Sequence, residues 1–82
     1  MVNNKGIFEL VRINLKSNFH FLECVDIKLE DKLYDYLSLV DIIDVVIYLD
    51  LLFWTETKYE EIVKFKTVGD LVKYYRENRV RR

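Results

Sequence analysis

Ser38 is the residue of this 82-residue chain that is best placed for covalent chemistry. It lies in the stretch YDYLSLVDIIDV, residues 34–45, directly before a long apolar run and three residues before Asp41. Two interpretations of this serine are open. An exposed hydroxyl at the start of a helix can carry a covalently attached group, or it can cap the helix by accepting a backbone N–H group of the first turn, which contributes about 1 kcal/mol.

The other side chains with metal-binding or catalytic potential do not form a site in the sequence. His20 and Cys24 are four residues apart, a spacing that can place two ligands on one helical face. A structural zinc site needs four ligands, and no second pair lies nearby. We therefore expect no metal site, a packed histidine and a buried thiol. Because no Ser/His/Asp order, Gly-rich phosphate loop or clustered carboxylate pair stands out, we also expect no catalytic residues and no enzyme activity.

Three segments of the chain match the pattern of a capping box, in which Ser or Thr is followed three residues later by an acid. They begin at Ser38, Thr57 and Thr67, and each precedes a segment of helical length. Together with the helical spacing of the apolar residues, they predict an all-α fold in a single domain, residues 1–82. The predicted helices cover residues 4–17, 39–54, 58–64 and 68–79. A loop of roughly twenty residues joins the first two helices, and its own apolar residues are expected to order it.

The composition indicates a folded protein. With 51% hydrophobic residues, no Pro and two Gly, the chain does not belong to the disordered class. The single Cys24 cannot form an internal disulfide, and the first residues lack the apolar segment of a secretory signal, so we expect a cytoplasmic protein. The longest apolar run contains Asp41, Asp44 and Asp50 and is shorter than the ~20 apolar residues of a membrane span, so we expect no membrane segment.

Charges are distributed unevenly along the chain. Residues 23–61 carry eleven acidic residues and three lysines, whereas residues 62–82 carry seven basic residues and two acidic residues. The basic end, YYRENRVRR, is the kind of segment that can bind nucleic acid. Because the acidic middle of the chain would repel the same polyanion, we do not expect nucleic acid as a partner.

The second predicted helix is apolar on nearly every side, apart from a narrow polar stripe that includes Asp41 and Asp44. A helix that is hydrophobic all round is normally buried all round, which a four-helix monomer of this size can hardly arrange. One hypothesis is that the residues around Ile47, Leu51 and Trp54 contact a second protein or a second copy of this chain. The alternative is that the long loop covers this side of the helix.

Two blocks of the sequence resemble the acyl carrier protein family. FKTVGDLVKYY, residues 65–75, is similar to the last-helix signature of that family, in which an apolar residue and Thr-Val-Gly-Asp precede further apolar positions. SLVDIIDVVIYLDLLF, residues 38–53, is similar to the family's second helix, which usually begins with Asp-Ser-Leu-Asp. The interval between the blocks matches without gaps, and Ile27 and Leu33 fit the loop positions that family members tuck into the core. The resemblance implies a four-helix bundle with a long loop between the first two helices and a short third helix.

Members of the acyl carrier protein family attach a 4′-phosphopantetheine arm to the serine of Asp-Ser-Leu, and the thiol of this arm carries an acyl group as a thioester between enzymes. The resemblance therefore implies a carrier in fatty acid biosynthesis and lipid metabolism, with Ser38 as the attachment residue and 4′-phosphopantetheine as the cofactor. It also implies that Asp41 and Asp44 dock on basic patches of enzymes of acyl transfer or synthesis. The carrier domain itself catalyses nothing.

The chain departs from the family pattern at the attachment residue. In the ungapped register, Ser38 falls on the family's Asp and Leu39 falls on its serine. Moving Ser38 to the attachment position requires one inserted residue in the helix, which rotates every later apolar position by ~100° or demands a bulge. Two functions stay open. One is a carrier that presents an acyl group on Ser38, and the other is a carrier-like interaction module that has lost the attachment serine and binds partners through the second helix.

Overall fold

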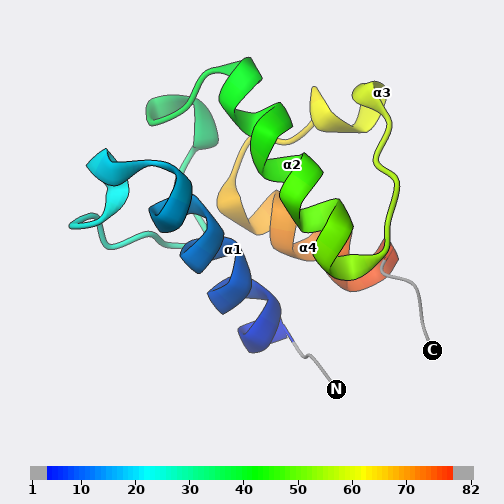
Figure 1. Ribbon diagram of the computed structural model, residues 1–82, viewed down its shortest axis with the longest axis horizontal. Coiled ribbons are helices and arrows are strands. Elements are labelled where there is room, and N and C mark those ends of the chain that lie inside the picture. The colour runs from blue at the N-terminus through cyan, green and yellow to red at the C-terminus, as the bar shows by residue number, and fades with distance from the viewer. Residues whose placement is uncertain (1–3, 79–82) are drawn as a thin grey trace.

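Four α-helices and two short 3₁₀ turns make up the part of the chain that the computed structural model describes, residues 4–78. The elements are α1 Asn4–Asn18, η1 His20–Leu22, η2 Leu33–Asp35, α2 Leu39–Phe53, α3 Tyr59–Ile62 and α4 Val68–Asn78. No strand occurs among these residues, so the predicted all-α class is confirmed (Figure 1). All four predicted helices are present, and the predicted end of the last one at residue 79 lies outside the described residues.

The core of the bundle is formed between α1, α2 and α4. α1 packs against both of the other helices, and Figure 1 shows it beside α2, with α4 behind them. α1 contributes residues spaced four apart, because positions i and i+4 lie on one helical face. One face of α4 is buried in the same way. The buried residues of these two helices are Ile7, Val11, Leu15, Val68, Leu71, Val72 and Tyr75.

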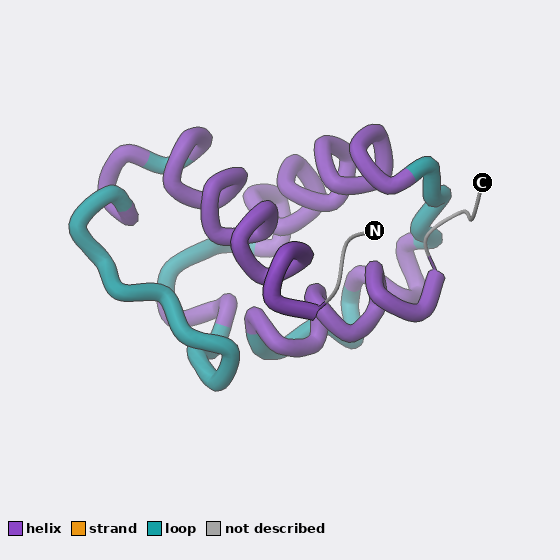
Figure 2. The backbone as a smooth tube through the Cα atoms, turned by 90° about the horizontal axis from the view of Figure 1, so that it is seen from below, coloured by secondary structure: helices purple, strands orange, loops and turns teal. Residues whose placement is uncertain are grey.

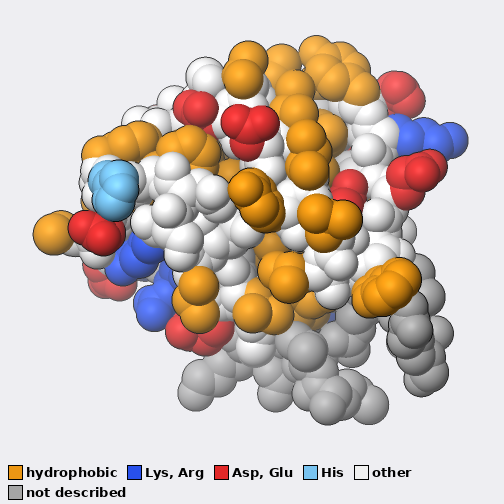
Figure 3. All heavy atoms as spheres, viewed as in Figure 1, with side chains coloured by type: hydrophobic (Ala, Val, Ile, Leu, Met, Phe, Trp, Pro, Cys, Tyr) orange, Lys and Arg blue, Asp and Glu red, His pale blue; other side chains and the backbone are white. Residues whose placement is uncertain are grey.

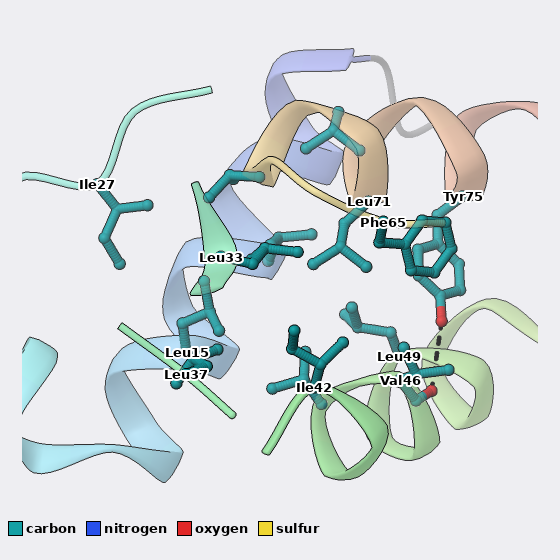
Figure 4. Packing of buried hydrophobic residues seen from close by; sticks show 14 of the residues in the cluster. Leu15, Ile27, Leu33, Leu37, Ile42, Val46, Leu49, Phe65, Leu71 and Tyr75 are labelled. Carbon is teal, nitrogen blue, oxygen red and sulfur yellow. Dashed lines mark hydrogen bonds between the residues drawn. The ribbon is translucent and has the colours of Figure 1, made fainter. Parts of the chain in front are cut away.

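Only one face of α2 enters the core. Its buried side chains recur at spacings of three and four residues, which places them on one side of a helix with 3.6 residues per turn. The buried residues of α2 are Ile42, Val45, Val46, Leu49 and Phe53. Figure 4 shows Ile42, Val46 and Leu49 facing Leu71 and Tyr75 of α4.

The long segment between α1 and α2 is ordered by its own apolar side chains. Figure 2 shows it as a loop at one end of the molecule, interrupted by short helical turns. Leu22, Ile27, Leu33 and Leu37 are all buried in the common core, and Figure 4 shows the last three. The expectation that Ile27 and Leu33 tuck into the core is therefore confirmed.

Backbone hydrogen bonds hold this segment against the start of α4. The Leu33 N–H group donates to the Lys66 carbonyl at 2.8 Å, and the Gly69 N–H group donates to the Leu29 carbonyl at 2.8 Å. A Cβ atom at position 69 would lie 3.1 Å from the Leu29 carbonyl oxygen, which is a tight contact. The glycine of the Thr-Val-Gly-Asp block thus allows the loop backbone to approach the helix.

Candidate functional site

Ser38 occupies the N-cap position of α2. Its backbone is extended, with φ −85° and ψ 170°, and its Oγ accepts a hydrogen bond from the Asp41 backbone N–H group at 3.3 Å. In return, Asp41 Oδ2 accepts the Ser38 backbone N–H group at 3.0 Å. These two bonds form the reciprocal capping box that the sequence predicts, and they satisfy N–H groups that have no partner within the helix. The serine is therefore a helix cap, and it is exposed.

Replacing Ser38 by alanine is expected to lower the free energy of unfolding by about 1 kcal/mol, because the Asp41 N–H group loses its acceptor. Ser38→Asp should retain most of the stability, since a carboxylate at the N-cap accepts the same N–H group and faces the positive end of the helix dipole. Urea unfolding followed by circular dichroism measures both effects. An alanine variant as stable as the unmodified sequence would show that the cap contributes nothing.

Leu39 is the first residue of α2, and the helix continues without a bulge to Phe53. The buried positions keep one helical register from Ile42 to Phe53. In the ungapped register, the position of the family's attachment serine is occupied by Leu39, which is half-buried and packs against the core. A leucine side chain has no nucleophile, so it offers no atom to which an arm could be bonded.

The side of α2 that faces away from the core is apolar and exposed. Ile47, Leu51 and Trp54 are 54%, 73% and 64% exposed, respectively. We call this surface the outer stripe, and it comprises Val40, Asp44, Ile47, Tyr48, Leu51, Leu52 and Trp54. In Figure 3 a band of hydrophobic side chains follows the course that α2 takes in Figure 1, with acidic side chains beside it.

The long segment between α1 and α2 leaves the outer stripe exposed, so the alternative in which this loop covers it is wrong. The buried apolar side chains of the loop point into the common core instead. Two other apolar residues of the loop, Phe21 and Leu29, are themselves exposed. The exposure of Ile47, Leu51 and Trp54 meets the first requirement of a contact surface.

The two acids predicted for docking have different surroundings. Asp44 is exposed within the outer stripe, whereas Asp41 is half-buried and engaged in the capping box. No basic residue occurs within α2, so the charge on this surface is negative only. This surface thus combines an apolar stripe with one isolated carboxylate, Asp44, in its first half.

Asp50 forms a polar cluster that the sequence did not indicate. Its Oδ1 accepts hydrogen bonds from the hydroxyl groups of Thr55 at 2.6 Å, Thr57 at 2.7 Å and Tyr75 at 2.9 Å. Its Oδ2 accepts the Thr57 backbone N–H group at 3.0 Å. This carboxylate therefore ties the end of α2 to the following loop and to α4, and its role is structural.

The prediction that Thr57 caps the third helix is wrong. The N-cap of α3 is Lys58, which makes no side-chain capping bond, and the Thr57 hydroxyl donates to Asp50 instead. The turn that makes this contact possible begins at Trp54, which has φ 56° and ψ 42° in the left-handed region. The Thr67 box, by contrast, is present, with the Asp70 N–H group donating to Thr67 Oγ1 at 3.1 Å.

Burial raises the pKa of the Tyr75 hydroxyl far above its usual range, and the charge of the Asp50 carboxylate acts in the same direction. Below the ordinary tyrosine pKa of ~10, the hydroxyl is neutral in the folded and the unfolded chain, and its full contribution to the free energy of unfolding is present. Above that pH the unfolded chain can ionise, so this contribution is lost as the pH rises.

We expect the last of the six tyrosines to ionise only when the chain unfolds. Tyrosinate absorbance and circular dichroism, recorded together in an alkaline titration, measure this. Ionisation of all six in a folded chain would contradict it.

His20 and Cys24 are both exposed, so the expectation of a packed histidine and a buried thiol is wrong. The His20 side chain is 93% exposed, and its Nδ1 lies 3.9 Å from a Glu23 carboxylate oxygen. The 3₁₀ turn that carries His20 directs only Leu22 into the core. No group of three or more residues suited to hold a metal ion occurs among residues 4–78.

The basic tail falls partly outside this range, since Arg79, Arg81 and Arg82 are not described.

The described helices form a small bundle of the acyl-carrier type, with a capped serine at the start of α2. No protein-family model matches the chain, and no curated protein matches it. None of the helices in the described part of the chain is long and apolar enough to cross a membrane.

Proposed function

We propose that this chain is a carrier-like protein-interaction module that binds partner proteins through α2 and has no enzyme activity. The observation that carries the proposal is the outer stripe. Six of its seven residues are apolar, and each of these six is more than half exposed. Contiguous apolar surface of this kind is typical of protein–protein contact sites, because its removal from water favours association.

The geometry around Ser38 favours an interaction module over a carrier. The Ser38 hydroxyl serves as the acceptor of the helix cap, and Leu39 stands where the family has its attachment serine. Aligning Ser38 with the attachment serine requires one inserted residue in the helix, which a bulge could accommodate. α2 has no bulge, so nothing in the helix favours that alignment. On this proposal the carrier fold has been retained and the arm has been lost.

Charge on the outer stripe indicates the chemistry of the protein partners. Asp44 is exposed among apolar side chains, and α2 offers no basic residue that could pair with it. A partner with a basic patch, such as an enzyme of acyl transfer or synthesis, would supply the missing cation. Such complementarity chiefly increases the association rate and selects among partners. The free thiol of Cys24 fits the reducing environment of the cytoplasm, where we place the module.

A second candidate is a carrier in fatty acid biosynthesis, and the exposure of Ser38 is the observation that favours it. Ser38 Oγ would hold 4′-phosphopantetheine through a phosphodiester, next to the positive end of the α2 dipole, which stabilises a phosphate. The arm would supply a thiol that carries acyl groups as thioesters. The side chain of Ser38 fits the attachment chemistry, whereas its place in the helix is one residue before the expected position.

The intact mass of the chain, measured after incubation with coenzyme A and a panel of phosphopantetheinyl transferases, separates the two candidates. The interaction module predicts an unchanged mass, because no competent serine stands at the attachment position. A mass increase that disappears in Ser38→Ala would establish the carrier instead. An authentic acyl carrier protein treated in the same reactions shows that each transferase is active.

A further inference from the structure

We propose that the outer stripe binds a second copy of this chain, and that two copies pair antiparallel along α2 about a two-fold axis between Ile47 and Tyr48. The inference rests on the proposed function, since it concerns the same surface, but the partner that it names is a second copy of this chain rather than a protein with a basic patch. In this arrangement, Asp44 of each copy faces Leu51 of the other, and Val40 lies near the end of the other helix.

The exposed area of the outer stripe suits a dimer of this kind. Its six apolar residues are between 51% and 73% exposed. With ~150–250 Å² for a large side chain, they expose roughly 700 Å² together. The largest apolar patch on a typical monomer covers roughly 300–600 Å². A standard protein–protein interface buries roughly 800 Å² on each partner, so the stripe with its rim supplies about one half of such an interface.

The distribution of charge selects the antiparallel direction. In a parallel pair, Asp44 of one copy would face Asp44 of the other, and Asp41 would face Asp41, which brings like charges together without a cation. In the antiparallel pair, Asp44 faces the apolar second half of the other helix, which carries no acid on the stripe. The two Asp44 side chains are then separated by ~10 Å along the helix axis, at 1.5 Å per residue.

The two halves of the stripe are complementary in an antiparallel pair. The first half carries Asp44, and the second half carries Tyr48, which is 51% exposed. The Tyr48 hydroxyl can donate to Asp44 of the second copy. A surface hollow of about 450 Å³ at the end of α2 is lined by Asp50, Leu51, Trp54, Thr55 and Glu56. The antiparallel register brings Val40 of the second copy to this hollow. A two-fold contact of this kind is closed, so it forms dimers rather than fibres.

Analytical ultracentrifugation over a concentration series tests the pairing. The chain is expected to sediment as a dimer that dissociates on dilution. Leu51→Glu should raise the dimer dissociation constant roughly 100-fold or more, because it places a second acid beside Asp44 of the other copy. Since Leu51 is exposed, this variant should fold, which circular dichroism verifies. Phe21→Glu changes an equally apolar, exposed residue outside α2 and should leave the dissociation constant unchanged.

A charge exchange tests the register of the two helices. Adding Asp44→Lys to Leu51→Glu places opposite charges across the antiparallel interface and should restore most of the lost affinity. In a parallel pair, lysine would face lysine, and the double variant would stay monomeric. A monomer at every concentration, or a dimer insensitive to Leu51→Glu, would overturn the inference.

The failure of this inference and that of the proposed function have different signatures. A monomeric chain whose mass is unchanged by phosphopantetheinyl transferases overturns the dimer and leaves the interaction module standing. A mass increase at Ser38 overturns the interaction module, whatever the oligomeric state.

Discussion

Replacing Asp50 by alanine is expected to lower the free energy of unfolding by about 3 kcal/mol, which is a large part of the stability of a small domain. The substitution removes one carboxylate that accepts four hydrogen bonds, from Thr55, from Tyr75 and twice from Thr57. The Tyr75 hydroxyl is buried and keeps only its 3.3 Å bond to the Val46 carbonyl (Figure 4). Urea unfolding under dilute conditions that favour the monomer measures the loss.

Asp44→Ala is the matched control for Asp50→Ala. Asp44 belongs to the same helix, but it is exposed, so its replacement should change the free energy of unfolding by less than about 0.5 kcal/mol. Tyr75→Phe should fall between the two variants, because it removes one donor and keeps the ring contact with Phe53 at 5.3 Å. Equal effects of Asp50→Ala and Asp44→Ala would show that the cluster does not hold α2 to α4.

Replacing Leu49 by alanine is expected to lower the free energy of unfolding by about 3 kcal/mol, through lost apolar burial and the cavity left behind. Leu49 is fully buried in the middle of α2 and faces α4 (Figure 4). Leu51→Ala makes the same chemical change two residues later, where the side chain is 73% exposed, and should cost less than about 0.5 kcal/mol. Urea unfolding under dilute conditions that favour the monomer compares the two leucines directly. Similar losses would contradict the assignment of one buried and one exposed face to α2.

The sequence predicted the features that depend on neighbouring residues. The helices follow from apolar residues at helical spacing, and the predicted range of the second helix, 39–54, agrees with α2 to within one residue. The capping boxes at Ser38 and Thr67 involve groups three residues apart, so local sequence is sufficient to indicate them. The exposed surface around Ile47, Leu51 and Trp54 also followed from pattern, because a small bundle cannot bury every side of an apolar helix.

Features that depend on tertiary contact were missed. Thr57 matches the capping pattern as well as Ser38 does, yet its hydroxyl donates to Asp50, seven residues earlier in the chain. The Tyr75 hydroxyl reaches the same carboxylate across 25 residues of sequence. His20 was expected to be packed because a metal site was excluded, but its side chain is 93% exposed on the 3₁₀ turn. In each case the local sequence is compatible with more than one arrangement, and the tertiary structure determines which one forms.

The most direct test of the central claim is the intact mass of two chains treated with coenzyme A and the same phosphopantetheinyl transferase. One chain is unmodified in sequence, and the other combines Ser38→Asp, Leu39→Ser and Val40→Leu, which restores Asp-Ser-Leu-Asp in the ungapped register. If this bundle is a carrier fold that lost its serine, only the restored chain gains the mass of the arm. A gain by the unmodified chain that is abolished in Ser38→Ala would contradict the claim.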